Sequence, residues 1–470
     1  MDAAPLYVPP MPPVPERELS FRAFLRAMRT NALTMWPRPA YEEPVRYGRF
    51  FHRTSMLLND PTGIHRVLVD NHANYARSPA SIRLLRPLVG NGLLLSEGDD
   101  WRLQRRTIAP ALAPRVMPLL VPHILSVARE TVAALGDAVG TQVDLLTIVQ
   151  RTALEIAARS MFSMGTQDFA DRLRAMVFDY GMNYARPHLL DVALPPSVPT
   201  PGDLWRMTFR RRWLRFIEGV VAAREAIDDG REARDLFDLL RVARDPETGQ
   251  GFTRAQLRDQ VATMILAGHE TTGATIFWAL TLLARAPDFQ ARVAAEVRGK
   301  DLAANPDLPV TRAVVNETLR LYPPAFTLGR FAKAADRAGE VAIPRGAIIL
   351  IAPWVLHRHK QNWTRPEAFD PGRFLPGAPP PARFAFMPFG AGPRICVGAQ
   401  FALVEATLVL AALMQEFEVS MDETEPVLPV GVVVTQPDRA PAFRLRRRSS
   451  SAGAESACPS STTSAAIMAN

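Results

Sequence analysis

The chain has 470 residues, of which 48% are hydrophobic and 22% are charged, and its 55 Lys and Arg against 47 Asp and Glu give a formal net charge of +8. Such a composition is that of an ordinary globular protein and excludes a chain that is disordered throughout. Two cysteines in this length exclude the disulfide framework that small secreted proteins need. We therefore expect a cytoplasmic protein.

The positive charge is almost all arginine, since the chain contains only three lysines. A pI of about 10.0 makes nucleic-acid binding one alternative, because clustered cations bind phosphate. The arginines are instead spread along the chain and alternate with acidic residues, as in residues 231–235, which is typical of solvated helix faces. We therefore expect no nucleic-acid partner, and a lack of DNA binding at low salt would exclude this alternative.

The first 20 residues are rich in proline and lack both the basic and the apolar segment of a signal peptide. The longest uncharged, apolar-rich stretch, residues 271–284, has 14 residues, whereas about 20 are needed to cross a bilayer. We expect a stiff N-terminal arm over residues 1–20 and no membrane span.

Apolar residues then recur with the helical period. This pattern predicts helices at about 116–135, 145–162, 203–228, 253–286 and 397–415. The longest one begins at a capping box formed by Thr253 and Gln256 and ends before Pro287. Short strand-like segments occur at 340–343 and 348–351. The sequence thus predicts a mainly α protein with small β-sheets.

The C-terminal segment, residues 448–470, is a Ser/Thr/Ala-rich tail with few large apolar side chains. Such a tail cannot bury enough surface to offset its ordering entropy, so we expect it to be disordered. Cys458 lies in this tail and is given no role. The folded domain is expected to span residues 21–447.

Cys396 has a different setting. It follows the glycine-rich run Phe-Gly-Ala-Gly-Pro-Arg-Ile, which includes Phe389, Gly390 and Arg394, and it precedes a predicted helix. Glycines permit tight turns and close backbone approach. A thiolate near a helix N-terminus is stabilised by the helix dipole, and Arg394 adds a cation for an anionic cofactor group.

This run resembles the haem-binding signature of the cytochromes P450, Phe-x-x-Gly-x-Arg-x-Cys-x-Gly, at every defined position. The resemblance implies one large helical domain whose small sheets help to enclose haem b. It also implies that the Cys396 thiolate is the ligand of the haem iron, that Phe389 packs beside the sulfur in the loop of Gly390, and that Arg394 pairs with a haem propionate.

A second motif, Ala267-Gly268-His269-Glu270-Thr271-Thr272, resembles the family's oxygen-activating helix. Glycine inside a helix costs about 1 kcal/mol relative to alanine, so Gly268 calls for a close neighbour, and the resemblance implies that Ala267 and Gly268 lie at the haem. A threonine hydroxyl can bond back to the carbonyl four residues earlier and open the helix locally. The resemblance implies that Glu270 and Thr271 relay the protons needed to cleave dioxygen.

A third motif, Glu317-x-x-Arg320, places the two charges on one helix face. The resemblance implies that Arg373, further along the chain, joins them in a buried structural cluster, although Gly372 stands where the family usually has an acidic residue. Trp101 and Arg105 resemble the family's Trp-x-x-x-Arg helix, which holds a haem propionate.

The resemblance further implies that Arg330 and His357 contact the haem. It implies an O2-dependent monooxygenase that hydroxylates or epoxidises an apolar small molecule, such as a lipid, a terpenoid or an aromatic compound. The implied pocket residues are Met264, Ala267, Thr271, Ala325, Phe326 and Val432.

Electrons would come from a separate ferredoxin or flavodoxin with its NAD(P)H reductase, since little chain remains for another redox module. A surface with Arg102, Arg106 and Arg394 could attract such an acidic partner. We expect the protein to be a monomer.

Two other enzyme or carrier classes remain as alternatives. The pair His357-x-His359 could belong to a non-haem iron site with two histidines and one carboxylate, although nothing else in the sequence clusters with it. A haem sensor or carrier would need no proton relay, so Glu270 and Thr271 argue against it.

Overall fold

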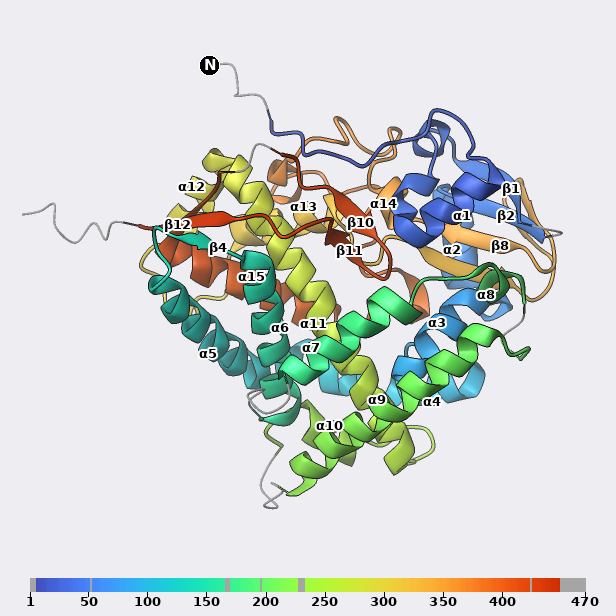
Figure 1. Cartoon of the computed structure of the whole chain (residues 1–470), viewed down its shortest axis with the longest axis horizontal. Helices are drawn as coiled ribbons and strands as arrows, with labels where there is room; N and C mark the ends of the chain where they lie inside the picture. The colour runs from blue at the N-terminus through green and yellow to red at the C-terminus, as the bar shows by residue number, and fades with distance from the viewer. Residues whose placement is uncertain are drawn as a thin grey trace, which may run out of the picture.

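The computed structural model describes residues 6–50, 53–164, 170–194, 197–226, 233–422 and 425–448. Its longest helix, α11 (Arg254–Arg285), crosses the middle of the molecule (Figure 1). The predicted capping box is confirmed, because the Thr253 side chain accepts a hydrogen bond from the Gln256 N–H while the Gln256 side chain accepts one from the Thr253 N–H. The helix is buried along most of its length, so the side chains on its faces have fixed positions in the core.

Several helices pack around α11 and share one large hydrophobic core with it. They are α5 (Met117–Gly136), α6 (Leu145–Phe162), α12 (Pro287–Val297), α13 (Pro309–Leu321) and α15 (Ala399–Glu416). A second core lies under α9 (Pro201–Ala226) and involves the first half of α11. The predicted helices at 116–135, 145–162, 203–228, 253–286 and 397–415 are therefore confirmed within about two residues at each end.

The remaining helices are mostly short and surround these cores. They are α1 (Phe21–Thr30), α2 (Pro61–His65), α3 (Pro79–Val89), α4 (Gly98–Ile108), α7 (Ala170–Asp179), α8 (Leu189–Ala193), α10 (Leu236–Val242) and α14 (Pro353–Leu356).

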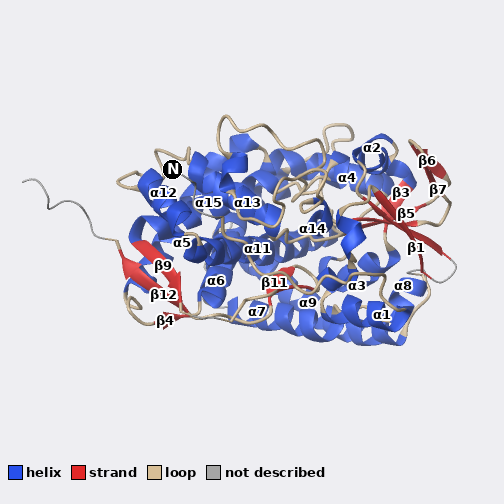
Figure 2. Cartoon of the chain, turned by 90° about the horizontal axis from the view of Figure 1, so that it is seen from above, coloured by secondary structure: helices blue, strands red, loops and turns tan. Residues whose placement is uncertain are grey.

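The sheets are small, and Figure 2 shows the two largest at opposite ends of the molecule. The largest has the order β1-β2-β8-β5-β3, in which only β2 and β8 run parallel. A three-stranded sheet has the order β4-β12-β9, and β6-β7 and β10-β11 are two-stranded. The strands are β1 (Val45–Phe50), β2 (Arg53–Leu58), β3 (Tyr75–Arg77), β4 (Gln142–Val143), β5 (Leu328–Ala332), β6 (Asp336–Ala338), β7 (Val341–Ile343), β8 (Ile348–Ile351), β9 (Phe417–Met421), β10 (Pro429–Gly431), β11 (Thr435–Pro437) and β12 (Phe443–Arg447). The prediction of a mainly α protein with small sheets is confirmed.

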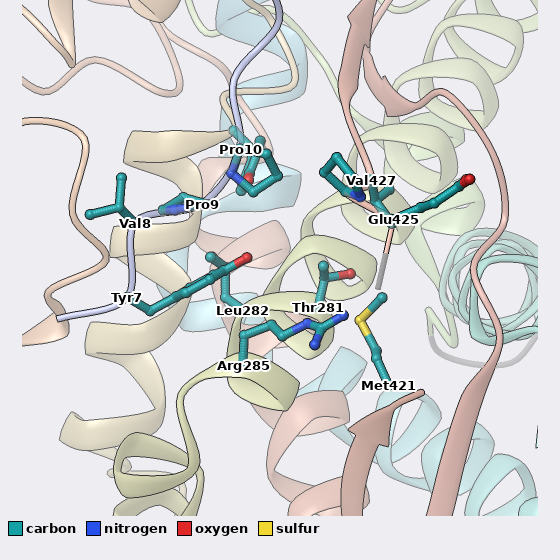
Figure 3. Close-up of a pocket in the computed structure, with 12 residues that line it drawn as sticks. Tyr7, Val8, Pro9, Pro10, Thr281, Leu282, Arg285, Met421, Glu425 and Val427 are labelled. Carbon is teal, nitrogen blue, oxygen red and sulfur yellow. The ribbon is translucent and has the colours of Figure 1, made fainter. Parts of the chain in front are cut away.

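The described part of the proline-rich segment packs against the rest of the chain. The Phe369 N–H donates a hydrogen bond to the Tyr7 carbonyl, and the Arg38 N–H donates one to the Pro15 carbonyl. Figure 3 shows Tyr7, Val8, Pro9 and Pro10 over the last turns of α11, where they border a pocket of about 290 Å³. The tail from residue 449 onward, with Cys458, lies outside the described residues.

By length and composition alone, two helices in the described part of the chain are long and apolar enough to cross a membrane. One includes α5 and the other is α15. Both contribute buried residues to the large core, and a core helix of a globular protein passes the same test.

Candidate active site

The loop before Cys396 is shaped by glycines in the left-handed backbone region. Gly390 has φ 75° and Gly392 has φ 72°. A Cβ atom on Gly392 would lie 2.0 Å from the carbonyl oxygen of Leu68, so no other residue fits there. The Cys396 N–H donates to the Phe389 carbonyl at 2.9 Å, which closes the loop just before α15 begins.

Cys396 keeps exposed surface, although many protein atoms surround its sulfur. Burial therefore raises the pKa of the thiol, while the Gly398 N–H and the Arg105 guanidinium lower it. Arg105 is also tied to this loop, since its Nη1 donates to the Ile395 carbonyl at 2.8 Å. The structure thus brings Arg105 of α4 and Cys396 together, as the two motifs implied.

Trp101 lies on the same helix, and the guanidinium of Arg394 stacks 4.4 Å from the centre of its ring. Arg394 donates to the Ser96 carbonyl at 3.0 Å and to the Glu97 carboxylate at 2.6 Å. Three predicted residues, Trp101, Arg105 and Arg394, therefore occupy one corner of the site beside the cysteine loop.

Arg330 joins this corner together with Arg77, a residue that the sequence did not single out. The two face each other across the β3–β5 ladder. Burial lowers the pKa of Arg77 to about 9, helped by repulsion from Arg330 and Arg394, and burial and Arg394 lower the pKa of Arg330 to about 10. The Arg77 Nε is buried without a hydrogen-bond partner. Only the strand register reveals this pairing, because residues 77 and 330 lie far apart in the chain.

His357, in contrast, is not placed to contact a haem propionate. Its side chain is fully buried, its Nε2 accepts from the Met387 N–H at 2.8 Å, and its Nδ1 lies 3.1 Å from the Arg320 carbonyl. Since Nε2 accepts, Nδ1 carries the proton and donates to that carbonyl. Both ring nitrogens are thus used in the core, which corrects the sequence-based assignment.

On α11, Ala267 is exposed although its neighbours Ile265 and Leu266 are buried, so a space opens beside the helix here. The Thr271 hydroxyl donates to the Ala267 carbonyl at 2.7 Å, the back-bond that the motif implied. Gly268 also lies close to α6, because a Cβ there would lie 3.2 Å from the Met161 Cε.

Glu270 is partly buried, and its Oε1 accepts a hydrogen bond from the Gln436 amide at 2.6 Å. Burial raises the pKa of its carboxyl group to about 7, although the Gln436 hydrogen bond opposes the shift. Glu270 and Gln436 line a cavity of about 810 Å³, together with Val432 in the turn between β10 and β11. A carboxyl group with this pKa can both release and regain a proton at neutral pH.

Glu317, Arg320 and Arg373 meet as implied. Arg320 donates to both Glu317 carboxylate oxygens, at 2.7 and 2.8 Å, and to the carbonyls of His357, Pro366 and Ala368. Arg373 Nε lies 3.5 Å from Glu317 Oε1. A Cβ at Gly372 would lie 2.8 Å from the Asp370 carboxylate, so glycine suits the turn that brings Arg373 here.

The other implied pocket residues differ in their exposure. Met264 is partly buried and packs against the second core, and Ala325 is exposed. Phe326 is 8% exposed and lies beside Gly431 of the β10–β11 hairpin.

Within the part of the chain that the structure describes, no three His, Cys, Asp or Glu side chains gather as a metal site. His357 is engaged as described above, and His359 Nε2 lies 3.1 Å from the Glu43 carbonyl. These contacts disfavour the non-haem iron alternative.

Comparison with known proteins agrees with this geometry. A model of the cytochrome P450 family matches residues 25–440. The chain is 33% identical to cyclooctat-9-en-7-ol 5-monooxygenase of Streptomyces melanosporofaciens over 70% of this chain and 72% of that one. It is 32% identical to pentalenene oxygenase of Streptomyces avermitilis, over 77% and 81% of the two chains. The haem domain of cytochrome P450DA shares the fold, with a TM-score of 0.77 over 93% of this chain and 98% of that one, at 24% identity.

The chain therefore belongs to the cytochrome P450 family and is a monooxygenase of that family. Its residues also fit the haem that the family implies. Three buried or half-buried cations, Arg77, Arg330 and Arg394, share one carboxylate, that of Glu97. The Nε of Arg77 has no hydrogen-bond partner. Two propionates would supply the missing negative charge, and Cys396 would supply the thiolate.

Proposed function

We propose that this monooxygenase oxidises an apolar terpenoid by hydroxylation or epoxidation. The observation that carries the proposal is the apolar character of the implied pocket residues Met264, Ala267, Ala325 and Phe326, which offer no fixed charge to a substrate. The names of two relatives, cyclooctat-9-en-7-ol 5-monooxygenase and pentalenene oxygenase, support a terpenoid over other lipids and aromatic compounds.

Cys396 would hold the haem iron, and Arg77, Arg105, Arg330 and Arg394 would hold the propionates, with Trp101 beneath Arg394. Haem bound there supplies the reduction of dioxygen and the insertion of one oxygen atom into the substrate. The arginines also keep the Cys396 loop in place, because Arg105 donates to the Ile395 carbonyl and Arg394 is bound to Glu97.

Glu270 and Thr271 would move protons toward the space beside Ala267. Glu270 is the proton donor, since the pKa of its carboxyl group, about 7, lets it lose a proton and regain it at neutral pH. The Thr271 hydroxyl donates to the Ala267 carbonyl, so it lies on α11 close to the residue where that space opens.

Electrons would come from a separate ferredoxin or flavodoxin and its reductase, and the protein would act as a cytoplasmic monomer. The predicted docking cations need one revision. Arg106 is bonded to the buried Asp245 at 2.7 and 2.9 Å and to Glu247, so its charge is already neutralised. Arg102 remains half-exposed and pairs only with the fully solvated Asp99 among the contacts seen in the described chain.

The substrate proposal is tested by adding terpenoid alcohols and hydrocarbons to the ferric holoprotein and recording the shift from low to high spin. We expect saturable shifts with terpenoids and none with charged metabolites such as nucleotides or amino acids. Shifts produced only by fatty acids or simple aromatic compounds would replace the terpenoid assignment, and shifts produced by charged metabolites would contradict an apolar pocket. Product analysis after turnover then separates hydroxylation from epoxidation.

A further inference from the structure

The C-terminal hairpin β10–β11 lies beside α11 (Figure 1) and reaches the acid of the proposed proton path. Thr435, at the start of β11, is fixed on three sides. Its carbonyl accepts from the Trp278 indole at 3.2 Å, its hydroxyl donates to the Pro323 carbonyl at 2.6 Å, and its N–H donates to the Pro324 carbonyl at 3.2 Å. The backbone of this strand is thus held to α11 and to the segment that follows α13.

Successive side chains of a strand point to opposite faces. Thr435 is fully buried, and Gln436 therefore turns the other way, toward the cavity of about 810 Å³. There its Nε2 donates to Glu270 Oε1 at 2.6 Å, a contact between residues 166 positions apart. The backbone of Gln436 is paired with that of Val430 in the β10–β11 ladder, so Gln436 lies in a strand and not in a loop.

Other charged and titratable groups line the same cavity. They are His269 on α11, Asp171 and Arg174 on α7, Arg151 on α6, and Arg186 and Asp438. His269 is held by the Ile265 carbonyl, and burial lowers its pKa, so it stays neutral. The pKa of Glu270 responds to burial, which raises it, and to Gln436, which lowers it. Gln436 is therefore the side chain that can set the state of this acid.

We propose that Gln436 is a positioning residue for Glu270: its amide holds the carboxyl group in one orientation within the cavity and stabilises the ionised form. This inference rests on the proposed role of Glu270 as a proton donor. The physical reason is that a neutral donor with a fixed backbone favours the carboxylate in a site where burial favours the acid. Without it, the acid would hold its proton at neutral pH and rotate freely.

The direct test is a pH titration of the Glu270 carboxyl group by infrared spectroscopy in the resting ferric holoprotein. The band of the protonated group is assigned as the one that Glu270→Gln removes. We expect Gln436→Leu to raise the titration midpoint by about one pH unit, because the hydrogen bond to the carboxylate is lost. The pH profile of product formed per NAD(P)H consumed should move in the same direction.

Gln150→Leu is the matched control. Gln150, on α6, lines the same cavity, whereas the hydrogen bond to Glu270 comes from Gln436. Gln436→Glu has the shape of the native residue and tests the same point should the leucine variant fold poorly, because a second carboxylate raises the midpoint further.

An unchanged midpoint in both Gln436 variants, or an equal shift in Gln150→Leu, would overturn the inference. A wild-type coupling ratio in Glu270→Gln would instead contradict the role of Glu270, whatever the midpoint shows.

Discussion

Glu270 and Thr271 are neighbours in sequence, but their surroundings give them different tasks. Glu270 is held by Gln436 across a cavity, whereas Thr271 bonds within its own helix to the Ala267 carbonyl. Under the proposed function, the first arrangement would set when a proton is released, and the second would hold a hydroxyl near the reacting groups. Single substitutions of Glu270 and of Thr271 can test the two proposed roles separately.

We expect Thr271→Ala to uncouple the enzyme, because the hydroxyl beside the Ala267 carbonyl, which we propose relays protons, would be lost. Product formed per NAD(P)H consumed should fall by at least about tenfold, because a positioned proton-transfer group typically contributes on the order of 10²–10⁴-fold. Thr281→Ala is the control, since Thr281 makes the same type of back-bond, to Phe277, further along α11. Equal coupling in wild type and Thr271→Ala would contradict the relay.

Glu270 also makes a pH-dependent contribution to stability. Its pKa is raised from 4.5 to about 7 by folding, so its contribution is fully present below pH 4.5 and is lost as the pH rises through 7. Relative to Glu270→Gln, the wild type should therefore lose stability between pH 5 and pH 8, as measured by urea unfolding. Parallel pH dependence of the two proteins would show that the carboxyl group is not buried in solution.

The sequence singles out Cys396, Glu270 and Glu317 because each belongs to a local motif, and the structure places Glu317 against Arg320 as that motif predicts. It missed Arg77 and Gln436, because their partners, Arg330 and Glu270, become neighbours only through strand register and hairpin placement. His357 was misassigned for a related reason. A histidine in a sequence does not show whether its ring nitrogens are already used by backbone groups.

Among the elements, α13 and the segment after α14 are joined by the Glu317–Arg320 pair. Both side chains are fully buried, and the Asp370 N–H also donates to Glu317 at 2.8 Å. The pair thus links α13 to this segment, because Arg320 also donates to the His357, Pro366 and Ala368 carbonyls. A buried network of this kind is costly to break, because the remaining charge stays unpaired.

We expect Glu317→Gln to lower the free energy of unfolding by about 3–5 kcal/mol, since Arg320 and Arg373 would remain without a counter-charge. Chemical denaturation measures this loss. Glu42→Gln removes an exposed pair with Lys360 and should cost less than about 1 kcal/mol. Similar losses in the two variants would mean that the Glu317 cluster is open to water.

Helices were predicted better than strands. The bounds of α6 agree with the sequence, and α11 begins at its capping box, because apolar period and caps are local signals. The hairpin β10–β11 was not predicted as strands. Contacts from distant residues hold it, among them Asn31, whose side chain bonds to both Pro429 and Gly431.

At the scale of the whole molecule, the charge distribution bears on the redox partner. The net charge of +8 and the half-exposed Arg102, on the same helix as Arg105, favour an acidic protein. We expect the reduction rate by an acidic ferredoxin to fall as ionic strength rises, and Arg102→Glu to slow it at low salt. Rates that do not change with salt or with this substitution would contradict docking by charge. Arg115→Glu, at another exposed arginine, serves as a control for net charge.

The mainly helical fold could be predicted as a class, since helical period dominates the chain. The order of strands in the sheets could not, because short segments carry little local signal and their pairing is set by the packed helices.

The central claim is that Cys396 ligates a haem iron as a thiolate, and the absorption spectrum of the reduced, CO-bound protein tests it most directly. We predict a Soret band with the strong red shift of thiolate ligation, which Cys396→Ala abolishes. A Soret band without that shift in the wild type, or the same shifted band in Cys396→Ala, would contradict the claim.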